Sequence, residues 1–237
     1  MNVRIKMKLC NATVEKIDEL NSTVKLFKLK LNEKISFVPG QFGTCMFKIN
    51  EESINRSYSY ASINCKNVDE IEFCIRLNLE GKATPFLFSI KEGESFKIAG
   101  PMGRMILPEN LNKDKKLIFL ATGTGVGPFR GMIKQALENG NNVSLYFGCR
   151  NEKDILFLDE FNATSKNNSK FNFYPVLTRG TESWKGLRGY IQDFIYEDIN
   201  DKVYVLCGNP FMAKAVLEKL STLGVDEENI VYEKWTK

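Results

Sequence analysis

The sequence predicts two domains, an antiparallel β-barrel followed by an α/β domain built on a parallel sheet. Three observations lead to this prediction. The 237 residues are enough for two domains of ordinary size. The first half carries short alternating apolar runs separated by turn signals, which is typical of a barrel or sandwich. The second half alternates short apolar strands with amphipathic helices, which indicates a parallel sheet covered on both faces.

Residue alternation predicts the elements of the first half. Apolar and polar residues alternate in a half-buried strand at Ile71, Phe73, Ile75 and Leu77. Along residues 24–31 the apolar positions change phase, which indicates a β-bulge or a bend. The Pro39-Gly40 pair predicts a turn before a strand over residues 41–49. One short helix is expected near residues 85–89.

The second half is predicted to alternate strands and helices. Strands are expected over residues 116–121, 143–147 and 203–206, and helices over residues 132–137, 154–161 and 210–223. Asn209 suits an N-cap, Pro210 the first helical position and Gly224 the helix end. A polar stretch at 110–114 marks the boundary. The two domains are therefore expected to span residues 1–112 and 113–237.

Composition argues against several classes of function. The formal net charge of +4 is too mild for a nucleic-acid partner but suits a modest basic face for an acidic protein. We find no membrane-length apolar run and no signal core, so a cytoplasmic monomer is expected. The chain has no histidine, and its six cysteines lack C-x-x-C spacing, so no metal site is predicted. Its chemistry would then come from an organic cofactor.

Arg56-Ser57-Tyr58-Ser59 is the first candidate ligand motif. A guanidinium can bind a phosphate through two parallel hydrogen bonds, and a phenol ring can lie flat against a planar heterocycle. The Ser59 hydroxyl can hydrogen-bond a ring nitrogen. In a strand, Arg56 and Tyr58 project to one face and the two serines to the other. An ordinary strand with an exposed arginine and a half-buried tyrosine explains the tetrapeptide equally well.

Gly81-Lys82-Ala83-Thr84-Pro85 is the second candidate. Thr84 suits an N-cap and Pro85 the first helical position. The start of a helix offers free amides and a partial positive charge to a phosphate, and Gly81 permits close approach. A simple turn into a surface helix is the alternative interpretation. After an arginine-bearing strand, this segment would add a second anchor for a pyrophosphate.

Two further motifs follow predicted strands of the second half. Thr122-Gly123-Thr124-Gly125-Val126-Gly127-Pro128 can admit a dinucleotide pyrophosphate. Its spacing is G-x-G-x-G, and the next strand ends in Gly148-Cys149-Arg150 without a carboxylate for a ribose hydroxyl. It is therefore not the usual NAD fingerprint. Cys207-Gly208-Asn209-Pro210-Phe211-Met212 should line the same crevice, although Cys207 could also be a small core thiol.

These motifs together resemble the ferredoxin–NADP reductase family of flavoenzymes over nearly the whole chain. The resemblance implies an FAD-binding barrel and a Rossmann-like domain that binds NADP(H), with the flavin at their interface. It implies that FAD is bound by Arg56, Ser57, Tyr58, Ser59, Gly81, Lys82, Ala83, Thr84 and Trp235. It implies that the nucleotide is bound by Thr122, Gly123, Thr124, Gly125, Arg150, Arg179, Cys207, Gly208 and Met212.

The same resemblance assigns catalytic roles to Ser59, Cys207 and Glu233. Ser59 would lie near flavin N5, Cys207 would line the nicotinamide pocket, and Glu233 matches the family's C-terminal glutamate. Trp235 matches the aromatic residue that covers the other flavin face. That residue is often tyrosine, so tryptophan is a departure. A stacked indole would have to move aside before nicotinamide reached the flavin.

The resemblance implies hydride transfer between NADP(H) and FAD, coupled to single-electron exchange with ferredoxin or flavodoxin. Arg150 and Arg179 resemble the positions that clamp a 2′-phosphate, which favours NADP(H). The segment 184–191 is similar to NAD-using oxygenase reductases, so NAD(H) stays open. The alternatives are an NADH-dependent reductase component of an oxygenase system, a free-flavin reductase, and a non-enzymatic electron-transfer or regulatory subunit.

Overall fold

A computed structural model describes residues 6–196 and 198–233. The chain forms two compact units: one takes in residues up to 106 together with 127–132, and the other residues 107–126 with those from 133 on. The domain boundary between residues 112 and 113 stays a prediction. Within the described residues, no helix has both the length and the apolar character needed to cross a membrane.

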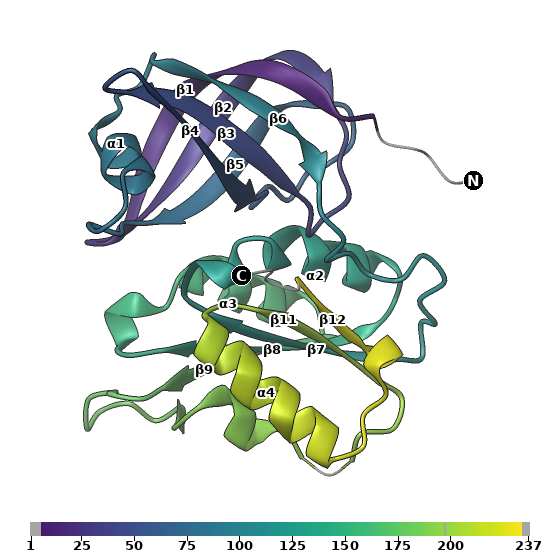
Figure 1. Cartoon of the computed structure of the whole chain (residues 1–237). Coiled ribbons are helices and arrows are strands. Elements are labelled where there is room, and N and C mark those ends of the chain that lie inside the picture. The colour runs from purple at the N-terminus through teal and green to yellow at the C-terminus, as the bar shows by residue number, and fades with distance from the viewer. Residues whose placement is uncertain (1–5, 197, 234–237) are drawn as a thin grey trace. The chain divides into compact units, whose positions relative to one another are not determined.

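The first unit is a six-stranded antiparallel sheet in the order β4-β3-β6-β1-β2-β5 (Figure 1). Just beyond β4, Tyr60 bridges to Phe73 in β5, so the two edge strands of the sheet approach each other and the sheet curls into a barrel. The predicted antiparallel barrel is confirmed. Its elements are β1 (Lys8–Asn21), β2 (Val24–Ile35), β3 (Phe42–Ile49), β4 (Glu52–Ser59), β5 (Val68–Arg76), α1 (Ala83–Ser89) and β6 (Ser95–Met102).

The bulge expected near residues 24–31 lies in the partner strand. Leu26 and Phe27 are both buried, which accounts for the change of phase. Between β1 and β2, however, the register passes from Val14 to Lys16 on β1, which leaves Glu15 as the extra residue. The change of phase in β2 therefore marks the position of a β-bulge, and the extra residue of that bulge lies in β1.

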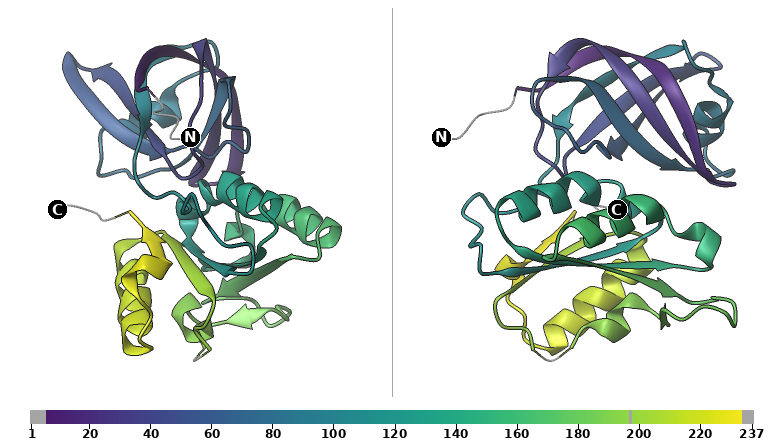
Figure 2. Two further views of the ribbon diagram at one scale, coloured as in Figure 1. Left: turned by 90° about the vertical axis from the view of Figure 1, so that its right-hand side faces the viewer. Right: turned by 180° about the vertical axis from the view of Figure 1, so that it is seen from behind.

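The second unit is a six-stranded parallel sheet in the order β10-β9-β8-β7-β11-β12, with α2 and α3 on one face and α4 on the other (Figure 2). The predicted Rossmann-like sheet is confirmed. Its strands are β7 (Lys116–Thr122), β8 (Asn142–Cys149), β9 (Phe171–Leu177), β10 (Leu187–Arg188), β11 (Lys202–Cys207) and β12 (Ile230–Tyr232). Its helices are η1 (Gly123–Val126), η2 (Glu152–Asp154), α3 (Leu158–Asn167), η3 (Ile191–Phe194), α4 (Pro210–Thr222) and η4 (Glu227–Asn229). Helix α2 (Phe129–Glu138) begins within the first unit and belongs to the second from residue 133 on.

Burial explains why the central strands are uniformly apolar. Strand β7 is buried at every position from Leu117 to Ala121, because helices cover both faces of a parallel sheet. On the α4 face, alternate residues of β7 and β11 pack against the apolar side of the helix. This cluster includes Ile118, Leu120, Tyr204, Leu206, Met212, Val216 and Leu220.

The helix boundaries follow the sequence in one case and depart from it in another. Asn209 caps α4 and accepts a hydrogen bond from the Met212 amide at 2.8 Å, as predicted. The helix predicted over residues 154–161 is wrong. The chain forms η2 and then the later helix α3, and Phe157 between them has a positive φ of 55°. The apolar residues that suggested an earlier start are buried in the connection.

Candidate functional site

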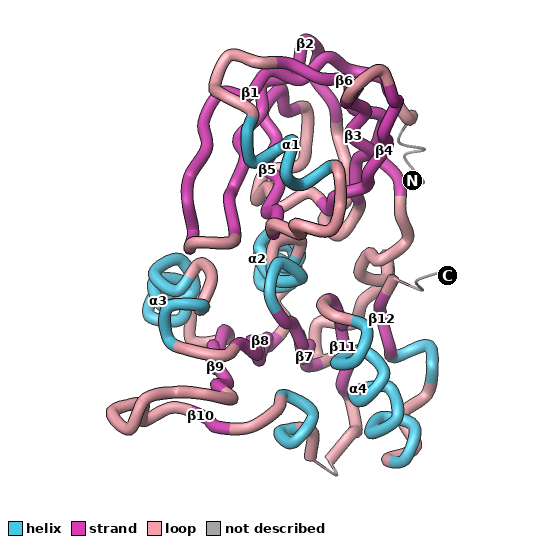
Figure 3. The backbone as a smooth tube through the Cα atoms, turned by 60° about the vertical axis from the view of Figure 1, so that its left-hand side comes forward, coloured by secondary structure: helices cyan, strands magenta, loops and turns pink. Residues whose placement is uncertain are grey.

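The candidate motifs of the second unit lie at the carboxyl ends of its central strands. Strand β7 lies between β8 and β11, which is where the order of strand addition reverses (Figure 3). Ligands of open α/β sheets bind outside the carboxyl ends of the strands at such a point. The segments that follow Thr122, Cys149 and Cys207, the last residues of β7, β8 and β11, all leave this edge.

A hydroxyl joins the ends of β7 and β11. Thr122 Oγ1 accepts a hydrogen bond from the Asn209 amide at 3.1 Å and a longer one from Asn209 Nδ2 at 3.3 Å. The two candidate nucleotide motifs, which are more than eighty residues apart, are therefore held against each other. This contact fixes where the first turn of α4 starts relative to the glycine loop.

Two glycines permit this close approach. A Cβ on Gly125 would lie 2.3 Å from the carbonyl oxygen of Cys207. A Cβ on Gly208 would lie 2.3 Å from Thr122 Oγ1 and 2.5 Å from Met212 Cε. Any larger residue would push the two loops apart. Thr122, Gly125, Cys207, Gly208 and Met212 thus meet at one place.

Gly123 contributes room. Its φ of +54° favours glycine, and a Cβ built there would meet nothing within 4 Å. Thr124 follows it in the short helix η1 and is half-buried. A backbone that is open on one side and followed by two short helices can admit a bulky phosphate group.

Cys207 and Glu233 lie close enough to interact electrostatically. Burial, and then the negative charge of Glu233, raise the pKa of the Cys207 thiol to about 12. The thiol is therefore neutral at physiological pH and is a weak hydrogen-bond donor, not a nucleophile. Trp235, the third residue expected near here, lies outside the described residues.

Arg150 and Arg179 are adjacent at the ends of β8 and β9. The Arg179 amide donates to the Arg150 carbonyl oxygen at 2.8 Å, and both residues are exposed. Within the described part of the chain, neither guanidinium has an ion-pair partner. Two guanidinium groups carried by neighbouring backbones could bind one phosphate.

In the first unit, Arg56 and Tyr58 lie next to each other on β4. Burial and the nearby Cys45 raise the pKa of the Tyr58 phenol, while the positive charge of Arg56 partly opposes this. The Arg56 guanidinium is exposed and donates to the Asn55 carbonyl oxygen at 2.8 Å. The Tyr58 ring packs partly on the barrel core, 6.0 Å from the Phe73 ring and tilted by 48°.

The two serines of the motif differ in their surroundings. Ser57 Oγ lies 3.0 Å from Thr44 Oγ1 on the neighbouring strand β3, on the outer face of the barrel. Ser59 is half-buried and pairs with Phe42 in the β3–β4 register. Ser57 therefore lies on the face opposite Tyr58, as expected for an extended tetrapeptide.

The start of α1 differs from the prediction. The helix begins at Ala83 with Lys82 as N-cap, so Thr84 and Pro85 lie inside it. The Thr84 hydroxyl donates to the Asn78 carbonyl oxygen at 3.0 Å and accepts from the Asn78 amide at 2.8 Å. The hydroxyl therefore binds the preceding loop instead of capping the helix. Gly81 leads into this turn.

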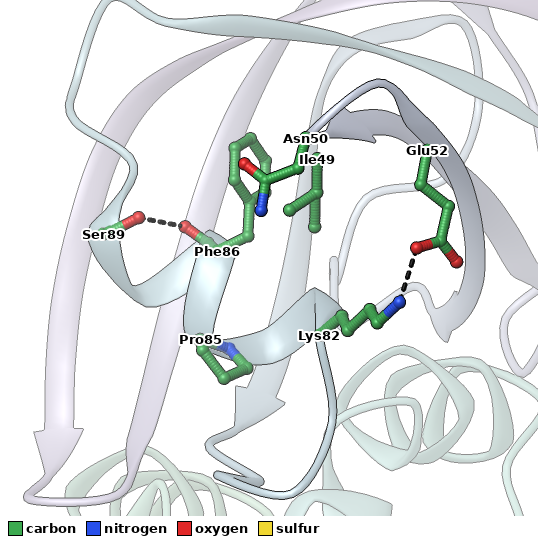
Figure 4. Close-up of a pocket in the computed structure, with 7 residues that line it drawn as sticks. All are labelled: Ile49, Asn50, Glu52, Lys82, Pro85, Phe86 and Ser89. Carbon is green, nitrogen blue, oxygen red and sulfur yellow. Dashed lines mark hydrogen bonds and ion pairs between the residues drawn. The ribbon is translucent and has the colours of Figure 1, made fainter.

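A shallow hollow of about 470 Å³ lies beside this helix (Figure 4). The lining cation is Lys82, and its ammonium pairs with Glu52 at 2.5 Å. The hollow therefore offers an apolar floor at Phe86 but little free charge. Its lining residues are Ile49, Asn50, Glu52, Lys82, Pro85, Phe86 and Ser89.

Two charged residues that the sequence did not single out, Arg130 and Glu152, each contact residues distant in the sequence. Arg130 Nη1 donates to the Ala61 carbonyl oxygen at 2.9 Å and to Glu72 Oε2 at 2.6 Å, and the arginine is buried. Glu152 accepts two hydrogen bonds from Thr181. Nothing in the local sequence indicates either contact.

Two family models match the chain. Residues 11–106 match the model described as oxidoreductase FAD-binding domain, and residues 119–218 match the oxidoreductase NAD-binding domain. Together they take in most of both units. The two models follow each other in the same order as the barrel and the parallel sheet.

Two curated relatives are identical to the chain at just over a quarter of the aligned positions. One component of the Na⁺-translocating NADH-quinone reductase of Pseudoalteromonas atlantica is 28% identical over 209 residues, which are 78% of this chain and 49% of the relative. The chain thus spans about half the length of that relative. The ferredoxin–NAD(P)⁺ reductase component of the naphthalene 1,2-dioxygenase system of Pseudomonas putida is 27% identical over 230 residues, which are 94% of this chain and 68% of the relative.

A solved structure shows the same fold. The cytochrome P450 reductase GcoB of Amycolatopsis superposes with a TM-score of 0.90 over the whole chain and 72% of the neighbour, at 24% identity. An antiparallel barrel followed by a doubly covered parallel sheet is thus a known arrangement of these elements.

Proposed function

Because the chain belongs to the FAD- and NAD-binding oxidoreductases of the ferredoxin–NADP reductase type, we propose that it transfers hydride between NADP(H) and FAD. We further propose that it exchanges single electrons with ferredoxin or flavodoxin. The observation that carries the proposal is the contact of the glycine loop with the Cys207–Asn209 segment at the edge of the sheet. Both family motifs meet there, where a dinucleotide would bind.

The residues of the first unit suit a flavin dinucleotide. The Arg56 guanidinium has no carboxylate partner among the described residues, so the donors that do not bind the Asn55 carbonyl oxygen are available to a phosphate. Tyr58 presents a partly exposed ring beside it. We assign Arg56, Ser57, Tyr58 and Ser59 to the flavin, together with Gly81, Lys82, Ala83, Thr84 and Trp235. The bound flavin would supply the exchange of a hydride for single electrons.

The residues of the second unit suit a pyridine nucleotide. The open space at Gly123 fits a pyrophosphate, with Thr122, Thr124 and Gly125 beside it. The neutral Cys207 thiol can donate a weak hydrogen bond to the nicotinamide end, where Glu233 adds an acceptor. Gly208 and Met212 would complete that end. Arg150 and Arg179 are assigned to the 2′-phosphate.

The proposed partner is an acidic electron-transfer protein, and the proposed location is the cytoplasm. A net charge of +4 favours encounter with an acidic surface. A second candidate function is that of an NADH-dependent reductase component that feeds an oxygenase or another electron acceptor. The names of the two curated relatives, one from an NADH-quinone reductase and one from an oxygenase system, favour it.

Three measurements test the proposal. The purified protein should be yellow and release FAD on denaturation, at about one per chain, and release of FMN alone would contradict the FAD assignment. Arg56→Ala should weaken flavin binding by about tenfold to a hundredfold, because a charge-assisted phosphate contact is lost. Diaphorase assays with NADPH and NADH side by side then separate the two candidate functions, since a clear preference for NADH would favour the second.

A further inference from the structure

One carboxylate ties the end of β8 to the loop after β9. Glu152 Oε1 accepts a hydrogen bond from the Thr181 amide at 2.8 Å and another from the Thr181 hydroxyl at 2.6 Å. The hydrogen bond from the Thr181 side chain is the main cause that lowers the pKa of Glu152. In the same place, the Arg179 amide donates to the Arg150 carbonyl oxygen. The two segments are thus joined by backbone and side-chain contacts together.

The loop of residues 178–189 also has an internal scaffold. The Arg188 guanidinium donates to the carbonyl oxygens of Gly180 at 2.9 Å, Thr181 at 2.5 Å and Trp184 at 3.1 Å. A Cβ on Gly186 would lie 2.4 Å from the Trp184 ring, so the indole packs directly on the backbone. Arg188 is therefore used within the loop, although its charge alone would make it a candidate anion ligand.

This scaffold leaves Arg150 and Arg179 exposed and adjacent. A phosphate monoester held by two guanidinium groups forms strong, geometrically specific hydrogen bonds. Holding both arginine backbones in place before binding reduces the ordering cost that binding would otherwise carry. The Glu152–Thr181 contact is the closer side-chain link between the segments that bear the two arginines, and Thr178 Oγ1 also donates to the Cys149 carbonyl oxygen at 3.5 Å.

We propose that Glu152 is a positioning residue for nucleotide selection: through Thr181 it fixes loop 178–189 against the end of β8 and keeps Arg150 and Arg179 side by side for the 2′-phosphate of NADP(H). This inference rests on the proposed function, and in particular on its preference for NADP(H). The competing role for Glu152 is acceptor of the ribose 2′-hydroxyl of NAD(H), which a carboxylate near this strand end can bind. The occupation of Oε1 by Thr181 favours the positioning role.

The two roles predict opposite changes in the affinity for a 2′-phosphate when the Glu152 carboxylate is removed. By charge alone, removing Glu152 should strengthen the binding of a phosphate nearby. The positioning role predicts that Glu152→Ala weakens it, because the loop that bears Arg179 loses its tie. Calorimetric titration of the FAD-loaded full chain with 2′,5′-ADP and with 5′-AMP measures the 2′-phosphate contribution without any turnover.

For the wild type, 2′,5′-ADP should bind more tightly than 5′-AMP. Glu152→Ala should weaken the binding of 2′,5′-ADP by about tenfold and leave the binding of 5′-AMP unchanged. Glu152→Gln keeps an acceptor oxygen for Thr181 and should retain most of the affinity, which separates a lost contact from a failure to fold. Glu182→Ala is the matched control, because it removes an exposed carboxylate of the same loop. Its 2′,5′-ADP affinity should not fall.

Three outcomes would overturn the inference. If Glu152→Ala binds 2′,5′-ADP as tightly as the wild type or more tightly, the positioning role is wrong while the NADP(H) assignment stands. If it weakens both probes equally, Glu152 has a general structural role. If the wild type itself binds the two probes equally, and Arg150→Ala and Arg179→Ala change neither affinity, the NADP(H) preference is wrong and the inference falls with it.

Discussion

The amide of Asn209 donates a hydrogen bond to the hydroxyl of Thr122 at 3.1 Å, and this contact joins the two loops that form the candidate nucleotide site. Thr122 ends β7, and Asn209 caps α4. The glycine loop and the first turn of α4 therefore cannot shift independently.

Thr122→Val should weaken the contact between the glycine loop and the start of α4. Valine has nearly the shape of threonine but cannot accept the Asn209 amide, so about 1 kcal/mol of local stabilisation should be lost. We expect nucleotide affinity to fall severalfold, because the loops that bind it are no longer held together. Thr122→Ser keeps the hydroxyl and is the control. Equal affinities for the two variants would show that the hydroxyl contact does not support binding.

Gly125→Ala should damage the site through sterics. Its Cβ would lie 2.3 Å from the Cys207 carbonyl oxygen, a backbone atom that cannot move freely. Forcing a methyl group into such a place costs about 1–3 kcal/mol. Gly81→Ala is the matched control, since its Cβ would lie 3.6 Å from the nearest atom, an ordinary contact. Urea unfolding of both variants, monitored by circular dichroism, should show a lower unfolding free energy for Gly125→Ala and no change for Gly81→Ala.

The Arg130–Glu72 pair should matter more for stability than its neighbours on the surface. Glu72→Gln removes the carboxylate that pairs with the buried Arg130 guanidinium at 2.6 Å, and we expect a loss of about 3 kcal/mol in unfolding free energy, the lower end for buried pairs. Glu70→Gln on the same strand breaks an exposed pair with Lys30 and should cost at most about 0.5 kcal/mol. Similar unfolding midpoints for the two variants would contradict this account.

The Cys207 thiol should resist alkylation, and Glu233 should be part of the reason. Burial and the Glu233 charge raise the pKa of Cys207 from 9.0 to about 12, so little thiolate exists at pH 8. Glu233→Gln should lower that pKa and speed the reaction with iodoacetamide. Cys149 is the internal control, because its pKa is also raised to about 12, by burial and then by Asp154 and Glu152. Peptide mass mapping should show faster labelling at Cys207 alone.

The same shift has a consequence for stability. A group whose pKa is raised by folding stabilises the folded state fully below its ordinary pKa and loses that contribution as pH rises through the raised value. The contribution of Cys207 to the unfolding free energy should therefore be fully present below pH 9.0 and lost by about pH 12. Cys207→Ser should flatten the fall in unfolding free energy over that window, and an unchanged slope would contradict the assignment.

How far the sequence predicts the structure depends on the distance over which each signal acts. Asn209 caps α4 as predicted, because its partner is three residues away. Thr84 does not cap α1, because Asn78 in the preceding loop competes for its hydroxyl. Such a competitor is visible only once the turn is folded. Both sheets, and the meeting of the glycine loop with Gly208, follow from periodicity and strand order.

Contacts made across the fold could not be predicted in this way. Glu152 and Thr181 are separated by 29 positions and meet because β8 and β9 are parallel neighbours whose carboxyl ends share one edge. Arg130 precedes the helix predicted over residues 132–137, and the structure buries it against Ala61 and Glu72. A charged residue gives no local indication of a distant partner, so only the assembled fold identifies these two.

The central claim is that this chain passes hydride between a pyridine nucleotide and a bound flavin, and anaerobic stopped-flow mixing tests it most directly. The FAD-loaded protein is mixed with NADPH or with NADH, and the flavin absorbance near 450 nm is followed. We predict complete bleaching with NADPH, at a rate that saturates with nucleotide concentration and exceeds the rate with NADH. If neither nucleotide bleaches the flavin, the account is contradicted.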